Sequence, residues 1–417
     1  VDPDNNEYAN MPDNTTILGS LKLTGKSKKG LSIGIIESLT AEEKAELFLN
    51  GTESEEPVEP MTNYLVARVQ KDMNDNNTII GGMLTSTNRF FKNTNLDFLN
   101  KNSYSGGVDW TQFFKDKKYF VTLKYSMSHI QGDSTAMIYQ QESSRRYFQR
   151  PDNSYTEFDS SMTSMTGNAG TFQLGKRGQN KWRWVGWVTW RSPKFETNDI
   201  GFLSRSDAVF QVFWLSYRWS EPFSIFRNLN ISLDQWSGWD FGVNRNFYGS
   251  GLSSYMDFKN HWNLGTGFSL NGSGYSNTML RGGPSILLPG SSDFWIHFGT
   301  DRRKKLQIFG NTYQSRGFEE STSRSSYGID FVYRPFDALR ISFLPDYSIF
   351  ENKLQFVEIE NIDNEDRYIF AEIKQITTDL TIRIDYSITP NLTIQYYGSP
   401  FVSSGDYSDA KYITDPK

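Results

Sequence analysis

Hydrophobic and polar residues alternate one by one through most of the chain, which is the pattern of a β-strand with two unlike faces. Between Val121 and Ser128, the odd positions carry Val, Leu, Tyr and Met, whereas the even positions carry Thr, Lys and Ser. The same alternation recurs far along the chain, at residues 228–234, 339–343 and 380–388. The pattern therefore predicts an all-β protein.

Alternation by itself fits both a soluble β-sandwich and a membrane β-barrel, because each has one apolar and one polar face. Three further features favour the barrel. The segments have about 9–12 residues, enough to cross a bilayer when tilted. Trp and Tyr recur near segment ends, as at a membrane interface, and short connections alternate with long ones. We predict a large antiparallel transmembrane β-barrel of roughly 18–20 strands, with short periplasmic turns and long extracellular loops.

The two kinds of connection can be followed along the sequence. Short turns are expected at residues 25–29, 74–77, 115–118, 177–180, 301–304 and 334–337. Long connections are expected at residues 40–60, 93–102, 129–165, 191–206, 244–251 and 316–323, the first of them strongly acidic.

The ends of the predicted barrel raise a question of parity. We expect residues 1–401 to form the barrel and residues 402–417 to form a periplasmic C-terminal tail. The strand-like segments are odd in number, and the first and last of them are expected to run parallel. A bacterial barrel normally has an even, antiparallel set. We therefore expect a strand upstream of Val1, from the same precursor or another chain, to complete the wall.

Composition narrows the class further. Aromatic residues make up 15% of the chain, hydrophobic residues only 37%, and the mean hydropathy is −0.57. No apolar run approaches the roughly 20 residues of a membrane helix, and the absence of cysteine excludes disulfides. A net charge of −5 does not indicate a nucleic-acid partner. A propeller would show a repeat of about 40–50 residues, and the sequence has none.

Several stretches carry a family resemblance, the most distinctive being RSPKFETNDIGF at residues 191–202. The others are residues 21–26, 30–34, 59–64, 79–85, 223–230, 333–335 and 399–401. The chain resembles a family of outer-membrane β-barrels of unknown function that is common in Bacteroidota. In that family the barrel usually follows a periplasmic domain similar to a carbohydrate-binding module. The resemblance implies fold and location, and through the upstream domain a connection with saccharides.

The sequence offers little catalytic chemistry. The three histidines are far apart and no cysteine is present, so we expect no metal and no cofactor. Glycines at Gly265 and Gly267 within a strand pattern indicate close packing or a bend. Glu196 and Asp199 form the best acidic pair, but salt bridges that fold their loop are favoured over glycosidic chemistry. The acidic turn at residues 363–366 is interpreted as solvated rather than calcium-binding.

The longest predicted loop carries three arginines interleaved with aromatic residues. Two interpretations are open for them: contact with a glycan or lipopolysaccharide, or a loop that is solvated or folds into the barrel mouth. The candidate contact residues of the loops are Arg145, Arg146, Tyr147, Arg150, Glu196 and Asp199.

Charged residues opposite the lipid-type positions are expected to line the lumen, while Leu123, Ile231 and Ile382 are expected to face lipid. The candidate lumen residues are Lys22, Lys124, Arg183, Asp234, Arg340, Glu372, Lys374, Arg383 and Asp385. A barrel of about 20 strands left open would leak, so folded loops or an inserted segment are expected inside.

Three functions follow from this picture. The first is a passive or gated outer-membrane conduit, with saccharides as candidate solutes. The second is a plugged barrel that serves as a scaffold in a multi-protein outer-membrane complex. The third, a surface hydrolase, is the least favoured, and we do not expect an enzyme. The expected surroundings are outer-membrane lipid and lipopolysaccharide.

Overall fold

The computed structural model describes residues 7–49, 51–92, 94–178, 181–363 and 365–414. One antiparallel sheet of 19 strands makes up most of the molecule, which confirms the predicted fold class. The strands of this wall are β2 (Ile17–Lys26), β3 (Leu31–Thr40), β6 (Met61–Met73), β7 (Thr78–Phe90), β8 (Asn102–Phe114), β9 (Tyr119–Gln131), β10 (Ser164–Lys176), β11 (Trp182–Arg191), β12 (Ala208–Trp219), β13 (Phe226–Trp239), β14 (Arg245–Phe258), β15 (Asn263–Asn271), β18 (Ser291–Gly299), β19 (Leu306–Gly317), β20 (Thr322–Phe336), β21 (Leu339–Ile362), β22 (Glu365–Thr389), β23 (Leu392–Gly398) and β24 (Phe401–Tyr412).

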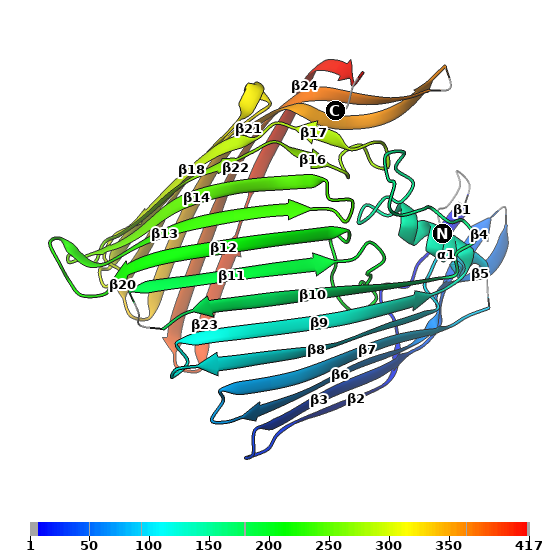
Figure 1. Ribbon diagram of the computed structural model, residues 1–417, viewed down its shortest axis with the longest axis horizontal. Coiled ribbons are helices and arrows are strands. Elements are labelled where there is room, and N and C mark those ends of the chain that lie inside the picture. The colour runs from blue at the N-terminus through cyan, green and yellow to red at the C-terminus, as the bar shows by residue number, and fades with distance from the viewer. Residues whose placement is uncertain (1–6, 50, 93, 179–180, 364, 415–417) are drawn as a thin grey trace.

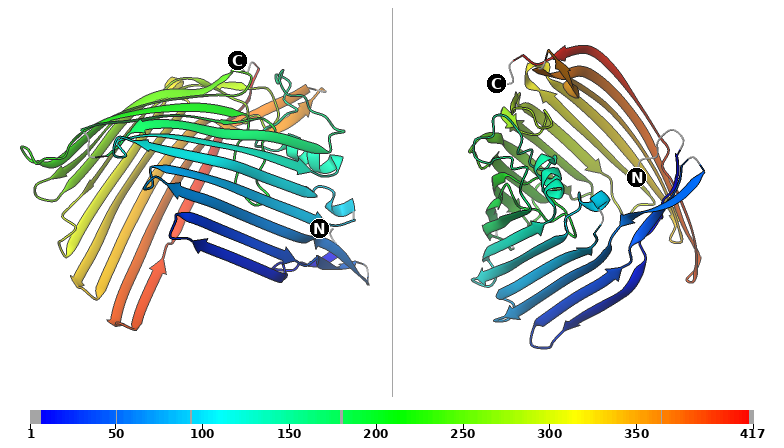
Figure 2. Two further views of the ribbon diagram at one scale, coloured as in Figure 1. Left: turned by 60° about the horizontal axis from the view of Figure 1, so that its bottom comes forward. Right: turned by 90° about the vertical axis from the view of Figure 1, so that its right-hand side faces the viewer.

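The wall follows chain order, each strand pairing antiparallel with the next wall strand as far as β22. Figure 1 shows this succession from the blue N-terminal to the red C-terminal strands. Figure 2 shows that the sheet curls around an interior, with the helix α1 (Ser134–Glu142) and nearby loops on its inner side. No helix in the described part of the chain is long and apolar enough to cross a membrane.

Short connections gather at one end of the wall, which we call the short-turn end. Two of its turns place three consecutive non-glycine residues at positive φ, from Asn74 to Asn76 and from Lys115 to Lys117. Gly30 has φ +81°, and a Cβ there would lie 2.6 Å from the carbonyl oxygen of Asp72. That turn therefore needs glycine for both its backbone conformation and its close approach to β6.

The opposite end, which we call the long-connection end, holds the additional structure. A small sheet of β1 (Glu7–Asn10), β4 (Glu43–Leu49) and β5 (Thr52–Glu59) replaces the acidic loop expected at residues 40–60. A hairpin of β16 (Gly274–Ser276) and β17 (Ile286–Leu288) lies between β15 and β18. Two expected long loops are wrong: residues 244–251 lie mostly in β14, and residues 316–323 hold only a short turn, the 3₁₀ helix η2 (Phe318–Glu320), between β19 and β20.

The C-terminal boundary predicted at residue 401 is also wrong, because the wall continues past it. β23 pairs with the second half of β22 and β24 with its first half, so the two form one edge of the sheet. Pro400 lies between them and has no N–H, but its carbonyl oxygen accepts a hydrogen bond of 3.0 Å from the Leu380 N–H. The described chain after Phe401 is therefore wall up to Tyr412 rather than a tail.

This edge also corrects the predicted strand directions. β23 follows a short turn after β22, so β23 and β24 run away from the short-turn end, whereas β2 runs toward it. The first and last strands are thus antiparallel. Because β23 and β24 lie end to end and share one position beside β22, the 19 strands fill an even number of positions in the wall. The parity argument for a further strand has no basis. Among the described residues, β2 does not pair directly with β23 or β24.

Strand register assigns each side chain to one face, since directly opposite residues of an antiparallel pair point the same way. Lys124 is opposite Asp109 on one side and Thr171 on the other. Following the pairs around the wall places seven of the nine predicted lumen residues on this same face: Lys22, Lys124, Arg183, Asp234, Arg340, Arg383 and Asp385. Leu123, Ile231 and Ile382 lie on the other face.

Glu372 and Lys374 do not follow the prediction. Each is an even number of residues from Ile382 within a ladder that has no register shift between them, so both share its face. Their ion-pair partners are Lys411 at 3.7 Å and Glu351 at 2.8 Å. They lie in the half of β22 that pairs with β24, where charged residues occupy outward positions.

Candidate functional site: the concave face and its inward loops

Two connections fold onto the charged face of the wall, and we call them the inward loops: residues 132–163 and residues 192–207. In the first, Met137 of α1 and Phe148 pack against Ile130 and Met165 at the ends of β9 and β10. In the second, Phe195 and Leu203 pack against Ala169 of β10. Because Ala169 and Met165 share the face of Thr171, this face is the concave one. The expected inserted segment is therefore present.

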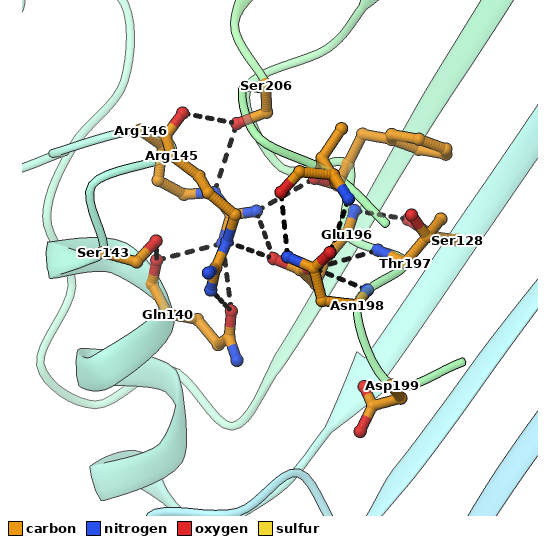
Figure 3. Close-up of polar contacts among 12 residues, drawn as sticks. Ser128, Gln140, Ser143, Arg145, Arg146, Glu196, Thr197, Asn198, Asp199 and Ser206 are labelled. Carbon is orange, nitrogen blue, oxygen red and sulfur yellow. Dashed lines mark hydrogen bonds and ion pairs between the residues drawn. The ribbon is translucent and has the colours of Figure 1, made fainter. Parts of the chain in front are cut away.

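Glu196 is the centre of the second inward loop (Figure 3). Its side chain is 1% exposed, and Oε2 accepts hydrogen bonds from Arg146 at 2.7 Å and Arg145 at 3.0 Å. Its Oε1 accepts the N–H groups of Thr197 at 2.9 Å and Asn198 at 2.8 Å. Burial lowers the pKa of the Arg146 guanidinium, and the charge of Glu196 opposes that shift. The cluster is a buried, fully bonded anchor between the two loops.

Asp199 fastens the same loop to the wall. One carboxylate oxygen accepts from Arg89 at 2.5 Å, and the other accepts from Ser103 at 2.5 Å and Asn100 at 3.0 Å. Arg89 and Ser103 belong to β7 and β8, so the loop spans several strands of the concave face. The predicted role of Glu196 and Asp199 in folding their loop agrees with these contacts.

A third buried cluster holds the end of the first inward loop. The Tyr155 hydroxyl donates to Asp207 Oδ2 at 2.5 Å, and the Phe241 N–H donates to Asp207 Oδ1 at 3.0 Å. Arg150 Nη2 lies 4.0 Å from Asp207 Oδ2. Burial raises the pKa of Asp207, and burial together with the hydrogen bond to Asp207 raises the pKa of Tyr155.

These contacts decide between the two interpretations of the arginine-rich loop. The side chains of Arg146 and Arg150 are 0% and 2% exposed, and Tyr147 is buried. Arg145, which is partly exposed, is bonded to Glu196 and Gln140. The burial of Arg146, Tyr147 and Arg150 favours the interpretation of a loop that folds into the barrel mouth over contact with lipopolysaccharide.

A cavity of about 470 Å³ lies between the second inward loop and the wall. Its lining includes Lys124, Arg191 and the ion pair of Arg68 with Asp109. That pair crosses the intervening strand β7 over Gly81, where a Cβ would lie 2.5 Å from Arg68 Nη2 and 2.8 Å from Asp109 Oδ2. Register places Lys124 on the concave face, and within the described residues its side chain makes no hydrogen bond or ion pair.

The opposite part of the concave face carries acids. Asp346 and Asp379 are directly opposite each other on β21 and β22, and Asp330 of β20 shares their face. Arg383 bonds Asp385 at 3.0 Å nearer the short-turn end. Charges of both signs therefore line the interior, some paired and some free.

The sequence did not single out Arg68, Asp109, Tyr155 or Asp207. Alternation could have placed Arg68 on the polar face of its strand, but its pairing with Asp109 depends on the register of three strands. No group of three or more metal-ligand side chains is found in the described part of the chain. Of the acidic turn, Asn364 lies outside the described residues, and Asp366 accepts a hydrogen bond of 2.9 Å from Asn361.

The sequence profile described as "Domain of unknown function (DUF5916)" matches residues 2–416. No curated protein sequence matches the chain. Among solved structures, the chain is similar to a BenF-like porin from Pseudomonas fluorescens Pf-5, with 8% identity, a TM-score of 0.37, and coverage of 85% of this chain and 92% of that one. It is also similar to Pseudomonas aeruginosa OpdK with vanillate, with 10% identity, a TM-score of 0.37, and coverage of 84% and 94%.

Proposed function

The chain belongs to the DUF5916 family, a domain of unknown function, and we propose that it is an integral outer-membrane protein that lets solutes pass through the interior of its curled sheet. The observation that carries the proposal is the separation of the two faces: unpaired charge on the concave face and exposed Leu, Ile and aromatic side chains on the convex face. Leu123, on the convex face, is 43% exposed next to the inward-facing Lys124.

The convex face supports a lipid environment. Trp182, Tyr217 and Trp219 form a chain of edge-to-face rings near the short-turn end, with centroids 4.7 Å and 4.4 Å apart. Aromatic residues of this kind form belts at membrane interfaces. We propose that the short-turn end lies on the periplasmic side and that this belt marks the periplasmic interface.

The inward loops support a narrowed conduit rather than a wide pore. They are held inside by buried ion pairs and apolar contacts, so they remain within the passage. Glu196 and Asp199, the best candidates for acid catalysis, are occupied as anchors, and this favours a protein without enzymatic activity. Several interior charges neutralise one another, which suits an uncharged solute such as a saccharide.

One observation favours the plugged scaffold as a second candidate. β21 and β22 have 24 and 25 residues and continue as a hairpin beyond the wall, seen in orange at the upper right of Figure 1. Exposed Val357, Ile359 and Ile362 lie on this extension. Apolar groups that project in this way fit a protein partner.

Planar-bilayer conductance tests the two candidates. The chain has no cysteine, so Lys124→Cys and its neighbour Leu123→Cys introduce single thiols on opposite faces. For the conduit, we expect ohmic current steps that fall when a charged, membrane-impermeant thiol reagent modifies Lys124→Cys, and no change for Leu123→Cys. A wild-type protein that is silent, but conducts once residues 134–162 are removed, would overturn the conduit in favour of the scaffold.

A further inference from the structure

We infer that Trp295, His297 and Tyr255 form a stacking platform for the rings of a neutral saccharide on the concave face. The inference deepens the proposed conduit and rests on it for the route by which a sugar arrives. Trp295 and His297 are two residues apart on β18 and therefore share one face, and Tyr255 belongs to β14. The platform lies outside the inward loops and their anchors.

The three rings are neighbours in space. The Trp295 and His297 rings have centroids 5.4 Å apart and are inclined by only 3°. Tyr255 lies 5.6 Å from Trp295 and 5.8 Å from His297, inclined by 42° and 43°. The Trp295 and His297 rings are thus stacked in parallel, and the Tyr255 ring is tilted against both.

Two glycines of β15 leave room for these rings beside the strand backbone. A Cβ at Gly265 would lie 2.1 Å from His297 Cε1, and a Cβ at Gly267 would lie 2.4 Å from Trp295 Nε1. The rings therefore occupy the space that side chains would take and rest on the strand backbone. Register places Trp295 and His297 on the concave face, and their contact with Gly267 and Gly265 confirms the close packing predicted for these two glycines.

Hydrogen-bonding groups border the aromatic surface. Asp293 precedes Trp295 on the same face and accepts from the Tyr313 hydroxyl at 2.9 Å and from Asn271 at 2.6 Å. Tyr313 is directly opposite Trp295. A cavity of about 600 Å³ adjoins the platform. Besides Tyr255 and His297, its lining carries charges of both signs: Arg227, Arg302, Arg303, Asp257 and Asp301.

This combination matches the chemistry of a sugar ring. A pyranose has an apolar face of C–H groups, which can lie on a flat aromatic surface, and hydroxyls at its edge, which bond to carboxylates and hydroxyls. Binding sites for small molecules commonly join an apolar surface with a few convergent polar groups. Asp293 disfavours an anion at one end of the platform, and in the cavity at the other end Arg303 and Arg227 are paired with Asp301 and Asp257. The ligand class that we infer is therefore a neutral saccharide.

The test uses the whole protein and a linear glucose oligosaccharide as the probe. In a planar bilayer, we expect the oligosaccharide to interrupt the wild-type current. Trp295→Ala should weaken the interruption about tenfold, and Gly267→Ala should weaken it by displacing the ring. Trp214→Ala, which removes an indole from the same face on β12, is the matched control and should leave the interruption unchanged.

Tryptophan fluorescence of detergent-solubilised protein, titrated with the same oligosaccharide, separates the two proposals. Saccharide binding without any conductance would support the platform and overturn the conduit. Conductance without interruption or binding would overturn the platform and leave the conduit standing. Interruption by an aromatic cation but not by the sugar would also overturn the platform, because cations stack on aromatic rings as well.

Discussion

At the long-connection end, the loop that carries Glu196 and the hairpin extension of β21 and β22 both lie against neighbouring segments, yet their contacts differ. The loop is held by a buried carboxylate between two arginines, Arg145 and Arg146. The extension is held by an apolar cluster of Leu280, Ile286, Phe356 and Phe370, which we call the apolar cap. The Phe356 and Phe370 rings meet edge to face with centroids 5.8 Å apart.

The two kinds of contact, a buried ion pair and an apolar cluster, imply different mobility for the two segments. A buried ion pair has directional contacts, and losing one partner leaves the other charged and desolvated. An apolar cluster is less directional and can relax around a lost side chain. We therefore expect the inward loop to be fixed in one position inside the passage, while the extension is held in place but tolerates adjustment.

The largest effect is expected for Glu196→Ala. It leaves Arg146 buried without its carboxylate, a change that costs about 3–5 kcal/mol. Hydrogen–deuterium exchange should increase in residues 134–148 and 192–207 and stay unchanged in β21 and β22. Unchanged exchange in the two loops would show that Glu196 does not anchor them.

Phe370→Ala should have the next largest effect, about 3 kcal/mol, because it empties the centre of the apolar cap. The expected exchange pattern is the reverse: faster in residues 354–370 and 279–288, and unchanged around Glu196. Leu288→Ala, at the partly buried rim of the same cluster, is the milder control. If Phe370→Ala loosened the inward loops equally, the two regions would form one cooperative unit.

A smaller effect is expected from pH at Asp207. Its pKa is raised by burial in the folded protein, so its contribution to stability is present below the ordinary pKa of about 4 and is lost as pH rises through the raised value. Asp240, Arg150 and Tyr155 surround the group. The protection factors of residues 150–156, which are corrected for the intrinsic pH dependence of amide exchange, should therefore fall with rising pH, and Asp207→Asn should flatten this dependence. An equally steep profile in the variant would assign the titration to another group.

The smallest effect is expected for Lys374→Ala in the part of β22 that pairs with β21 and β24. Lys374 and Glu351 are 2.8 Å apart, but their side chains are 55% and 46% exposed. Exposed pairs contribute about 0–1 kcal/mol, and salt screens them. The midpoint of thermal unfolding, measured in detergent without chemical denaturant, should change little from that of the wild type. A loss as large as that of Glu196→Ala would contradict the view that burial, rather than pairing itself, makes the loop anchor strong.

Much of the wall could be derived from the sequence, because its signal is local. Alternation with a period of two assigned Lys124, Arg183 and Arg383 to one face and Leu123 and Ile382 to the other, and register confirmed them. The rule failed at Glu372 and Lys374, since charge was taken as the mark of the inner face where position along the strand decides it. The predicted barrel boundary at residue 401 also failed, since β24 continues the edge of the wall beyond Pro400.

The sequence by itself thus determined the strand type, the two faces, most of the short turns, and the presence of inserted segments. The tertiary structure alone decided which groups meet inside: Arg68 with Asp109 over Gly81, Glu196 with two arginines, and Trp295 with His297 over Gly267 and Gly265. The physical reason is range. The face of a side chain depends only on its own strand, whereas each of these contacts depends on the register of several strands or on the path of a loop folded back into the interior.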